Sequence, residues 1–143
     1  MWFGAFVSIL CCPVQAEGLS ADSAVLQGVG LDGRWAQDCS KPAGEHNAYV
    51  VYVAPENATP TEQTYVDPGD IKTSALSHVR ALKNGDIEWA QTSEEVTTAV
   101  VTQVRGNRLR TWSSTNSEGL SDIVRGKYSN GRQTLWFNKC DTN

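Results

Sequence analysis

From residue 33 onward, short runs rich in β-branched and aromatic residues alternate with short polar turns. The runs recur at a spacing of roughly ten residues, and none keeps a helical period for three turns. They cover residues 35–39, 48–54, 62–66, 73–82, 86–92, 96–104, 108–113, 121–128 and 133–140. Asn-Gly pairs at 84–85 and 130–131 are strong hairpin signals. The pattern predicts an all-β fold, an antiparallel up-and-down meander that forms an eight- or nine-stranded barrel.

The N-terminus has a different pattern. Residues 2–14 are almost wholly apolar, and Val14 and Ala16 are small residues of the kind that signal peptidase recognises. The run is shorter than the roughly 20 residues of a membrane-spanning helix. We therefore expect a signal peptide over residues 1–16, a leader over residues 17–32 and the barrel domain over residues 33–143. A buried N-terminal helix or strand is the alternative. No Lys or Arg precedes the apolar run, so either the true start lies upstream of residue 1 or targeting is weak.

Cysteine placement supports export to the periplasm or the medium. Loss of residues 1–16 would remove Cys11 and Cys12 and leave Cys39 and Cys140. Two cysteines in an exported chain are expected to form one disulfide bond. Closing a loop of about 100 residues stabilises a fold by about 4–5 kcal/mol in the chain-entropy model. The bond would join the first predicted strand to the last, and these two strands are neighbours in a closed meander.

Charge and motif content argue against several classes of function. The net charge is −4 and the pI about 5.1, which disfavours nucleic-acid binding. The two histidines, His46 and His78, supply too few ligands for a zinc site. The chain has no nucleophile elbow and no glycine-rich phosphate loop. We expect no catalytic residues, no metal and no cofactor.

Aromatic and basic residues form one candidate patch. Arg108, Arg110 and Trp112 alternate along a predicted strand and share one face. Together with Trp89 and Trp136 they could bind an anionic ligand or a partner. The alternative is ordinary packing, in which arginine stems lie over tryptophan rings. Both interpretations remain open at this stage.

Two resemblances add to this picture. Gly33-Arg34-Trp35 at the head of a strand, followed by a meander, resembles the start of a lipocalin-type (calycin) barrel. That resemblance implies that Gly33 permits a tight turn and that Trp35 closes one barrel end. It also implies a basic residue from a late strand across the indole, for which Arg125 and Arg132 are candidates by position. The stretches GRWAQDCSKP (33–42) and WFNKC (136–140) are more closely similar to uncharacterised exported proteobacterial proteins.

The functional expectation follows from the predicted barrel. Large apolar side chains occur on both faces of the predicted strands, so either loops cover one face or the interior holds a ligand. We expect a periplasmic or secreted, non-catalytic, lipocalin-like binding module for a small apolar ligand. The alternative is an envelope interaction protein, such as a hydrolase inhibitor or an accessory subunit. A packed interior would exclude a ligand inside the barrel.

Overall fold

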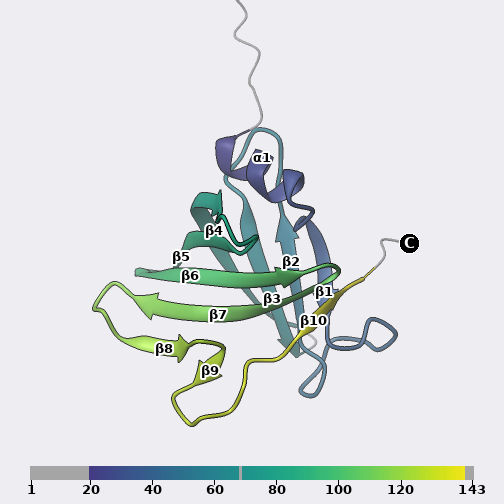
Figure 1. Cartoon of the computed structure of the whole chain (residues 1–143). Helices are drawn as coiled ribbons and strands as arrows, with labels where there is room; N and C mark the ends of the chain where they lie inside the picture. Colours follow the sequence, from purple (N-terminus) through teal and green to yellow (C-terminus); the bar gives the residue numbers. More distant parts are fainter. Residues whose placement is uncertain (1–19, 68, 141–143) are drawn as a thin grey trace, which may run out of the picture.

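The structure, a computed structural model, describes residues 20–67 and 69–140, without the side chains of Val66 and Asp67. The predicted signal peptide, residues 1–16, lies outside the described residues. One helix and ten strands follow in chain order (Figure 1). They are α1 (Ala21–Gly28), β1 (Gly33–Ala36), β2 (Tyr49–Val53), β3 (Thr61–Asp67), β4 (Asp70–Ala81), β5 (Ile87–Ser93), β6 (Val96–Arg105), β7 (Arg108–Asn116), β8 (Ser121–Val124), β9 (Lys127–Tyr128) and β10 (Phe137–Lys139).

The strands form a closed antiparallel barrel. Strands β1 to β9 pair in sequential order, and β10 pairs with both β1 and β7. Strands β1–β7 and β10 therefore close an eight-stranded barrel, while β8 and β9 extend the sheet from β7 (Figure 1). This confirms the predicted all-β antiparallel barrel.

The last third of the chain differs in detail from the prediction. The strand expected over residues 121–128 is divided by a turn at Arg125 and Gly126, whose φ angles are 50° and 72°. The last strand shrinks to three residues because the segment before it folds back on this turn. Thr134 donates its backbone N–H to the Gly126 carbonyl and its hydroxyl to the Thr111 carbonyl. These bonds take the place of the strand-pairing hydrogen bonds that a longer strand would have formed.

Alternate residues of the strands fill the barrel interior. Ile87, Trp89 and Gln91 share the inward face, as the alternation in β5 predicts. The rings of Trp89 and Tyr52 meet edge to face with centroids 5.7 Å apart. The buried core comprises Leu26, Leu31, Trp35, Tyr52, Ala54, Leu76, Val79, Ile87, Trp89, Val100 and Leu109.

Part of the predicted leader belongs to the barrel. Ser20 caps α1 by accepting a hydrogen bond from the Ser23 backbone N–H. Asp22, in the first turn, accepts a bond from the Val79 backbone N–H and so ties the helix to β4. Leu26 and Leu31 are fully buried. The helix therefore packs against one end of the barrel and contributes to its core (Figure 1).

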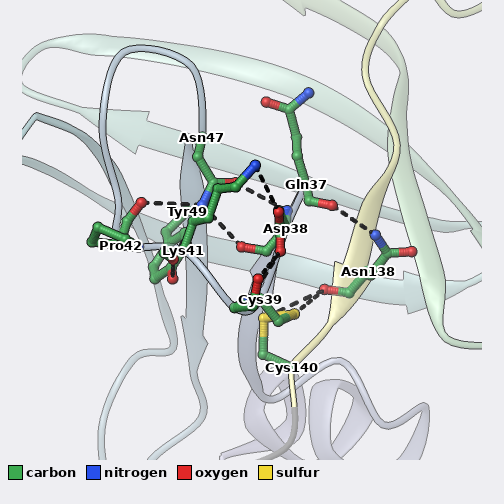
Figure 2. Close-up of a disulfide and its surroundings, with 10 residues drawn as sticks. Gln37, Asp38, Cys39, Lys41, Pro42, Asn47, Tyr49, Asn138 and Cys140 are labelled. Carbon is green, nitrogen blue, oxygen red and sulfur yellow. Dashed lines mark hydrogen bonds and ion pairs between the residues drawn. A yellow bond between two sulfur atoms is a disulfide. The ribbon is translucent and has the colours of Figure 1, made fainter.

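The predicted disulfide is present. Cys39 and Cys140 are bonded across a sequence separation of 101 residues (Figure 2). The backbone N–H of Cys140 also donates to the Arg34 carbonyl, so the end of the chain is bonded to β1. The disulfide reinforces the same closure that the β1–β10 pairing makes.

The loop after β1 is organised by one buried amide, Asn47. Its side-chain oxygen accepts from the Asp38 backbone N–H, and its nitrogen donates to the carbonyls of Asp38, Lys41 and Pro42 (Figure 2). Asp38 in turn accepts bonds from Ser40 and pairs with Lys41. These bonds, with Ser40 first, lower the pKa of Asp38 to about 2. The loop thus packs in one conformation beside the disulfide.

Candidate functional site

Four of the five predicted patch residues come together as an arginine–tryptophan ladder, formed by Arg108, Arg110, Trp112 and Trp136. The first three face outward from β7, and Trp136 lies directly before β10, which pairs with β7. The Arg108 and Arg110 guanidinium carbons lie 4.9 Å and 4.6 Å from the centre of the Trp136 ring. Arg110 also lies 5.1 Å from the Trp112 ring centre. Each distance is in the range of cation–π attraction.

The ladder joins three segments of the chain. Arg110 donates from Nε to the Gln103 side-chain oxygen on β6. At Gly126, in the β8–β9 turn, an added Cβ would lie 3.2 Å from the Trp112 ring. Within the described part of the chain, no carboxylate lies within 4 Å of Arg108 or Arg110, whereas Arg105 pairs with Asp86. The ladder therefore holds these segments together, and its two arginines still carry positive charge that no carboxylate neutralises.

Trp89 does not belong to the patch, contrary to the prediction. It pairs with Val100 on the inward face of the barrel and is 3% exposed. The other members lie at alternate positions whose side chains point to the outer face of the sheet. Trp89 lies two residues from the buried Ile87 along β5, so strand alternation is the signal that separates it from the patch.

The barrel end at Trp35 has a different cation from those expected. Trp35 is buried and donates from its indole nitrogen to the Leu31 carbonyl at 2.8 Å. The Lys139 ammonium lies 5.4 Å from the indole centre, while Arg125 and Arg132 lie in the β8–β9 turn and in the segment after β9. Register explains this, since Trp35 and Lys139 are direct partners across β1 and β10. The disulfide one residue further on was the signal that could have predicted this pairing.

A groove of about 650 Å³ lies on the outer face of strands β4 to β7. Two cross-strand rows form much of it, Ala90–Ala99–Thr115 and Glu88–Val101–Ser113. These rows alternate with the inward Trp89–Val100 pair, which places them outside the barrel. The side chains Ala90, Ala99 and Val101 are small and apolar, and they leave space that larger residues would fill. We call this feature the outer groove.

One rim of the outer groove is polar. The pairing of β4 with β5 shifts register between Ser77 and Arg80, and His78 in this bulge has a φ angle of 55°. The Ser77 hydroxyl lies 3.2 Å from His78 Nδ1, and Arg80 forms an ion pair with Glu88. The bulge therefore sets an imidazole and an ion pair beside the small apolar rows. In the sequence His78 was considered as a metal ligand, and the bulge that exposes it left no signal in the alternation.

A second polar group lies on the inward face. Glu62 of β3 accepts a hydrogen bond from the Gln91 side-chain nitrogen at 3.1 Å, and the same nitrogen donates to Ser74 Oγ at 3.1 Å. Burial raises the pKa of Glu62, although hydrogen bonds from Tyr52 and Gln91 act in the opposite direction. Burial likewise raises the pKa of Tyr52. These groups are bonded to one another, so they fill the interior and satisfy its polar atoms.

The described residues contain no cluster of three or more His, Cys, Asp or Glu side chains arranged to hold a metal. His46 lies in the loop after β1 and His78 in β4, so the two are not neighbours in the chain or the sheet. Within the same residues, no helix has the length and apolar character to cross a bilayer. The fold and the two outer features are thus the basis for a functional conclusion.

Comparison with known proteins adds no relative. No family model matches the chain, and no curated protein or solved structure matches it significantly. The barrel is compatible with a lipocalin-like binding module.

Proposed function

We propose that this protein is an exported, non-catalytic binding module that holds a small apolar ligand in the outer groove. The observation that carries the proposal is the groove itself, whose volume of about 650 Å³ falls within the roughly 300–1,000 Å³ of small-molecule sites. Ligand binding would bury the apolar surface of exposed small side chains such as Ala99, and this burial favours binding.

The outer face suits a ligand better than the barrel interior. Inside, Trp35, Tyr52, Trp89 and their neighbours form the buried core, and Glu62 is hydrogen-bonded among them. A ligand there would have to displace packed side chains, at a cost of several kcal/mol. The outer surface, rather than the expected interior, is therefore the place for an apolar ligand.

The polar rim of the outer groove indicates which chemical class of ligand would fit. His78 and the Arg80–Glu88 pair lie beside the apolar rows, so a ligand with an apolar body and one polar or anionic group matches both parts. The groove has no pair of clustered acids. Ser77 Oγ lies beside His78 Nδ1 at its rim, but among the described residues no carboxylate lies within 4 Å of His78 to orient the imidazole as a base. Binding without chemistry is the function that this set of side chains supports.

The test uses an apolar probe and a matched pair of variants. Anilinonaphthalene sulfonate, which has an apolar ring system and one anionic group, is titrated into the protein and its fluorescence is followed. Ala99→Leu fills the outer groove, whereas Ala75→Leu, on β4, makes the same change on the same outer face of the sheet but outside the groove. We expect at least tenfold weaker binding for Ala99→Leu and a change of less than twofold for Ala75→Leu. Equal binding by both variants contradicts the proposal.

Native mass spectrometry supplies a second readout. Protein purified from its own host should retain an apolar molecule of constant mass, and Ala99→Leu should lose it. An unliganded wild-type protein that also fails to bind the probe would exclude the groove as a ligand site.

An envelope interaction protein, such as a hydrolase inhibitor or an accessory subunit, is the second candidate. The unneutralised arginines of the ladder support it, because a partner carboxylate would complete their hydrogen bonding. The test is a pull-down from envelope extract with wild type and with Arg108→Gln. One stoichiometric partner that is lost with Arg108→Gln supports this function, and equal recovery by the two proteins counts against it.

A further inference from the structure

The segment that leaves the barrel after β7 has an unusual surface. We call residues 120–135, which include β8 and β9, the β8–β9 arm, and they lie at the periphery of the sheet (Figure 1). Among the described residues, eight large hydrophobic side chains are exposed, and four of them lie in this arm. They are Leu120 (61% exposed), Val124 (55%), Tyr128 (42%) and Leu135 (45%). Half of the exposed apolar side chains thus fall in 16 residues.

The same arm carries positive charge. Arg125, Lys127 and Arg132 are exposed, and within the described chain no carboxylate lies within 4 Å of them. Between Arg105 and Lys139 the chain has seven of its twelve basic residues and two of its sixteen acidic ones. A protein of net charge −4 therefore has a distinctly basic region beside β7 and β10.

Apolar and basic residues are interspersed along the arm, which has one acidic residue, Asp122. Val124 and Lys127 are direct partners across the tight turn at Arg125–Gly126. At the base of the arm, the half-buried indoles of Trp112 and Trp136 belong to the ladder. Aromatic rings with a polar atom, together with long basic side chains, are the groups that prefer the boundary between lipid headgroups and acyl chains.

We propose that the β8–β9 arm attaches this protein peripherally to an anionic lipid bilayer. Arg125, Lys127 and Arg132 contact the headgroups, and the exposed apolar side chains enter the interface between them. The arrangement favours a bilayer over a protein partner, because a protein interface needs a contiguous apolar centre with complementary shape. A fluid surface accepts separate apolar side chains interleaved with charges. This inference does not depend on the groove, since no arm residue lines it.

The test is co-sedimentation of the protein with vesicles of phosphatidylcholine alone or of phosphatidylcholine and phosphatidylglycerol at 3:1. All proteins compared have the same N-terminal segment, so differences between them report on the arm. We expect binding to the anionic vesicles, and its loss at high salt. The triple variant Arg125→Gln, Lys127→Gln, Arg132→Gln should bind them on the order of 100-fold more weakly, from roughly fivefold per charge.

Matched controls separate the position of the charges from their number. The triple variant Lys41→Gln, Lys72→Gln, Lys83→Gln removes the same charge from exposed positions outside the arm, and it should lose less than fivefold. For the apolar part, Leu120→Ser with Leu135→Ser should weaken binding at least tenfold. Val53→Ser with Ile71→Ser, at exposed positions elsewhere, should leave it within twofold.

Three outcomes would overturn the inference. The first is absence of binding to anionic vesicles, and the second is an equal loss of vesicle binding in the arm and control variants. The third is an arm variant that keeps vesicle binding but loses binding to an acidic protein partner. Ala99→Leu should bind vesicles like the wild type, so failure of the groove and failure of the arm are distinguishable.

Discussion

The Lys139 ammonium lies over the indole of Trp35, 5.4 Å from the ring centre, and joins the last strand of the barrel to the first. Lys139 also donates a hydrogen bond to the Gly30 carbonyl, in the segment between α1 and β1. The Trp35 indole donates to Leu31 in the same segment. One cation and one ring thus hold the closing strand pair and the helix connection together.

Removal of this charge should weaken the barrel. Lys139→Met keeps an unbranched apolar stem but loses the cation–π contact and the hydrogen bond to Gly30. We expect the free energy of unfolding, measured in urea, to fall by about 1–2 kcal/mol. Lys127→Met, on the exposed arm, is the control and should change it by less than about 0.5 kcal/mol. A Lys139→Met protein as stable as the wild type would show that the contact contributes nothing.

The disulfide should supply a large part of the stability. The double variant Cys39→Ser, Cys140→Ser frees a loop closed over 101 residues, and we expect a loss of about 4–5 kcal/mol in the free energy of unfolding. Wild-type protein unfolded in a reducing agent is the matched control and should show the same value as the double variant. If the reduced wild type matches the oxidised one, the crosslink does not constrain the unfolded chain as proposed.

Close packing in the ladder can be tested at a glycine. Gly126 has a φ of 72°, and an added Cβ would meet the Trp112 ring at 3.2 Å and the Arg110 guanidinium carbon at 3.3 Å. Gly131 has a φ of 81° and open space around the same position. Gly131→Ala should therefore cost about 1 kcal/mol from backbone strain alone, and Gly126→Ala about 2–3 kcal/mol. Equal urea midpoints for the two variants would mean that the Trp112 and Arg110 side chains move aside without loss of stability.

The interior carboxyl predicts a pH dependence. Burial raises the pKa of Glu62 in the folded state, so the folded protein holds this proton more tightly than the unfolded chain. The resulting stability is complete below the ordinary glutamate pKa and is lost as the pH rises through the raised value. Glu62→Gln should remove this decline and be more stable than the wild type at neutral pH. The measurement is the free energy of unfolding as a function of pH.

Asp38 is the natural contrast for that experiment. Its pKa is lowered to about 2, mainly by hydrogen bonds from Ser40, so its stabilising contribution is present above about pH 4 and is lost as the pH falls toward 2. Asp38→Asn should flatten the acid side of the curve, and at neutral pH it should lower the free energy of unfolding by a constant amount without changing its slope. The result would be contradicted if both variants altered the same pH range.

Much of the candidate site lay beyond sequence reasoning. Alternation along β7 correctly brought Arg108, Arg110 and Trp112 to one face, because a pleated strand has a fixed period of two. The outer groove was missed, because its rows combine residues from three strands and its rim depends on a bulge in β4 at His78. Trp89 and Trp136 look alike in the sequence, and only their positions in the pleat separate core from surface.

Local patterns alone determined that this chain is built of strands and that Cys39 pairs with Cys140. Residue alternation, turn signals and a count of two cysteines outside the expected signal peptide are properties of short segments and of composition, which need no tertiary information. Tertiary structure decided that Lys139 rather than Arg125 or Arg132 faces Trp35, and that the open space lies outside the barrel. Both depend on the register in which distant strands meet, and a shift of one residue would turn every side chain to the other face.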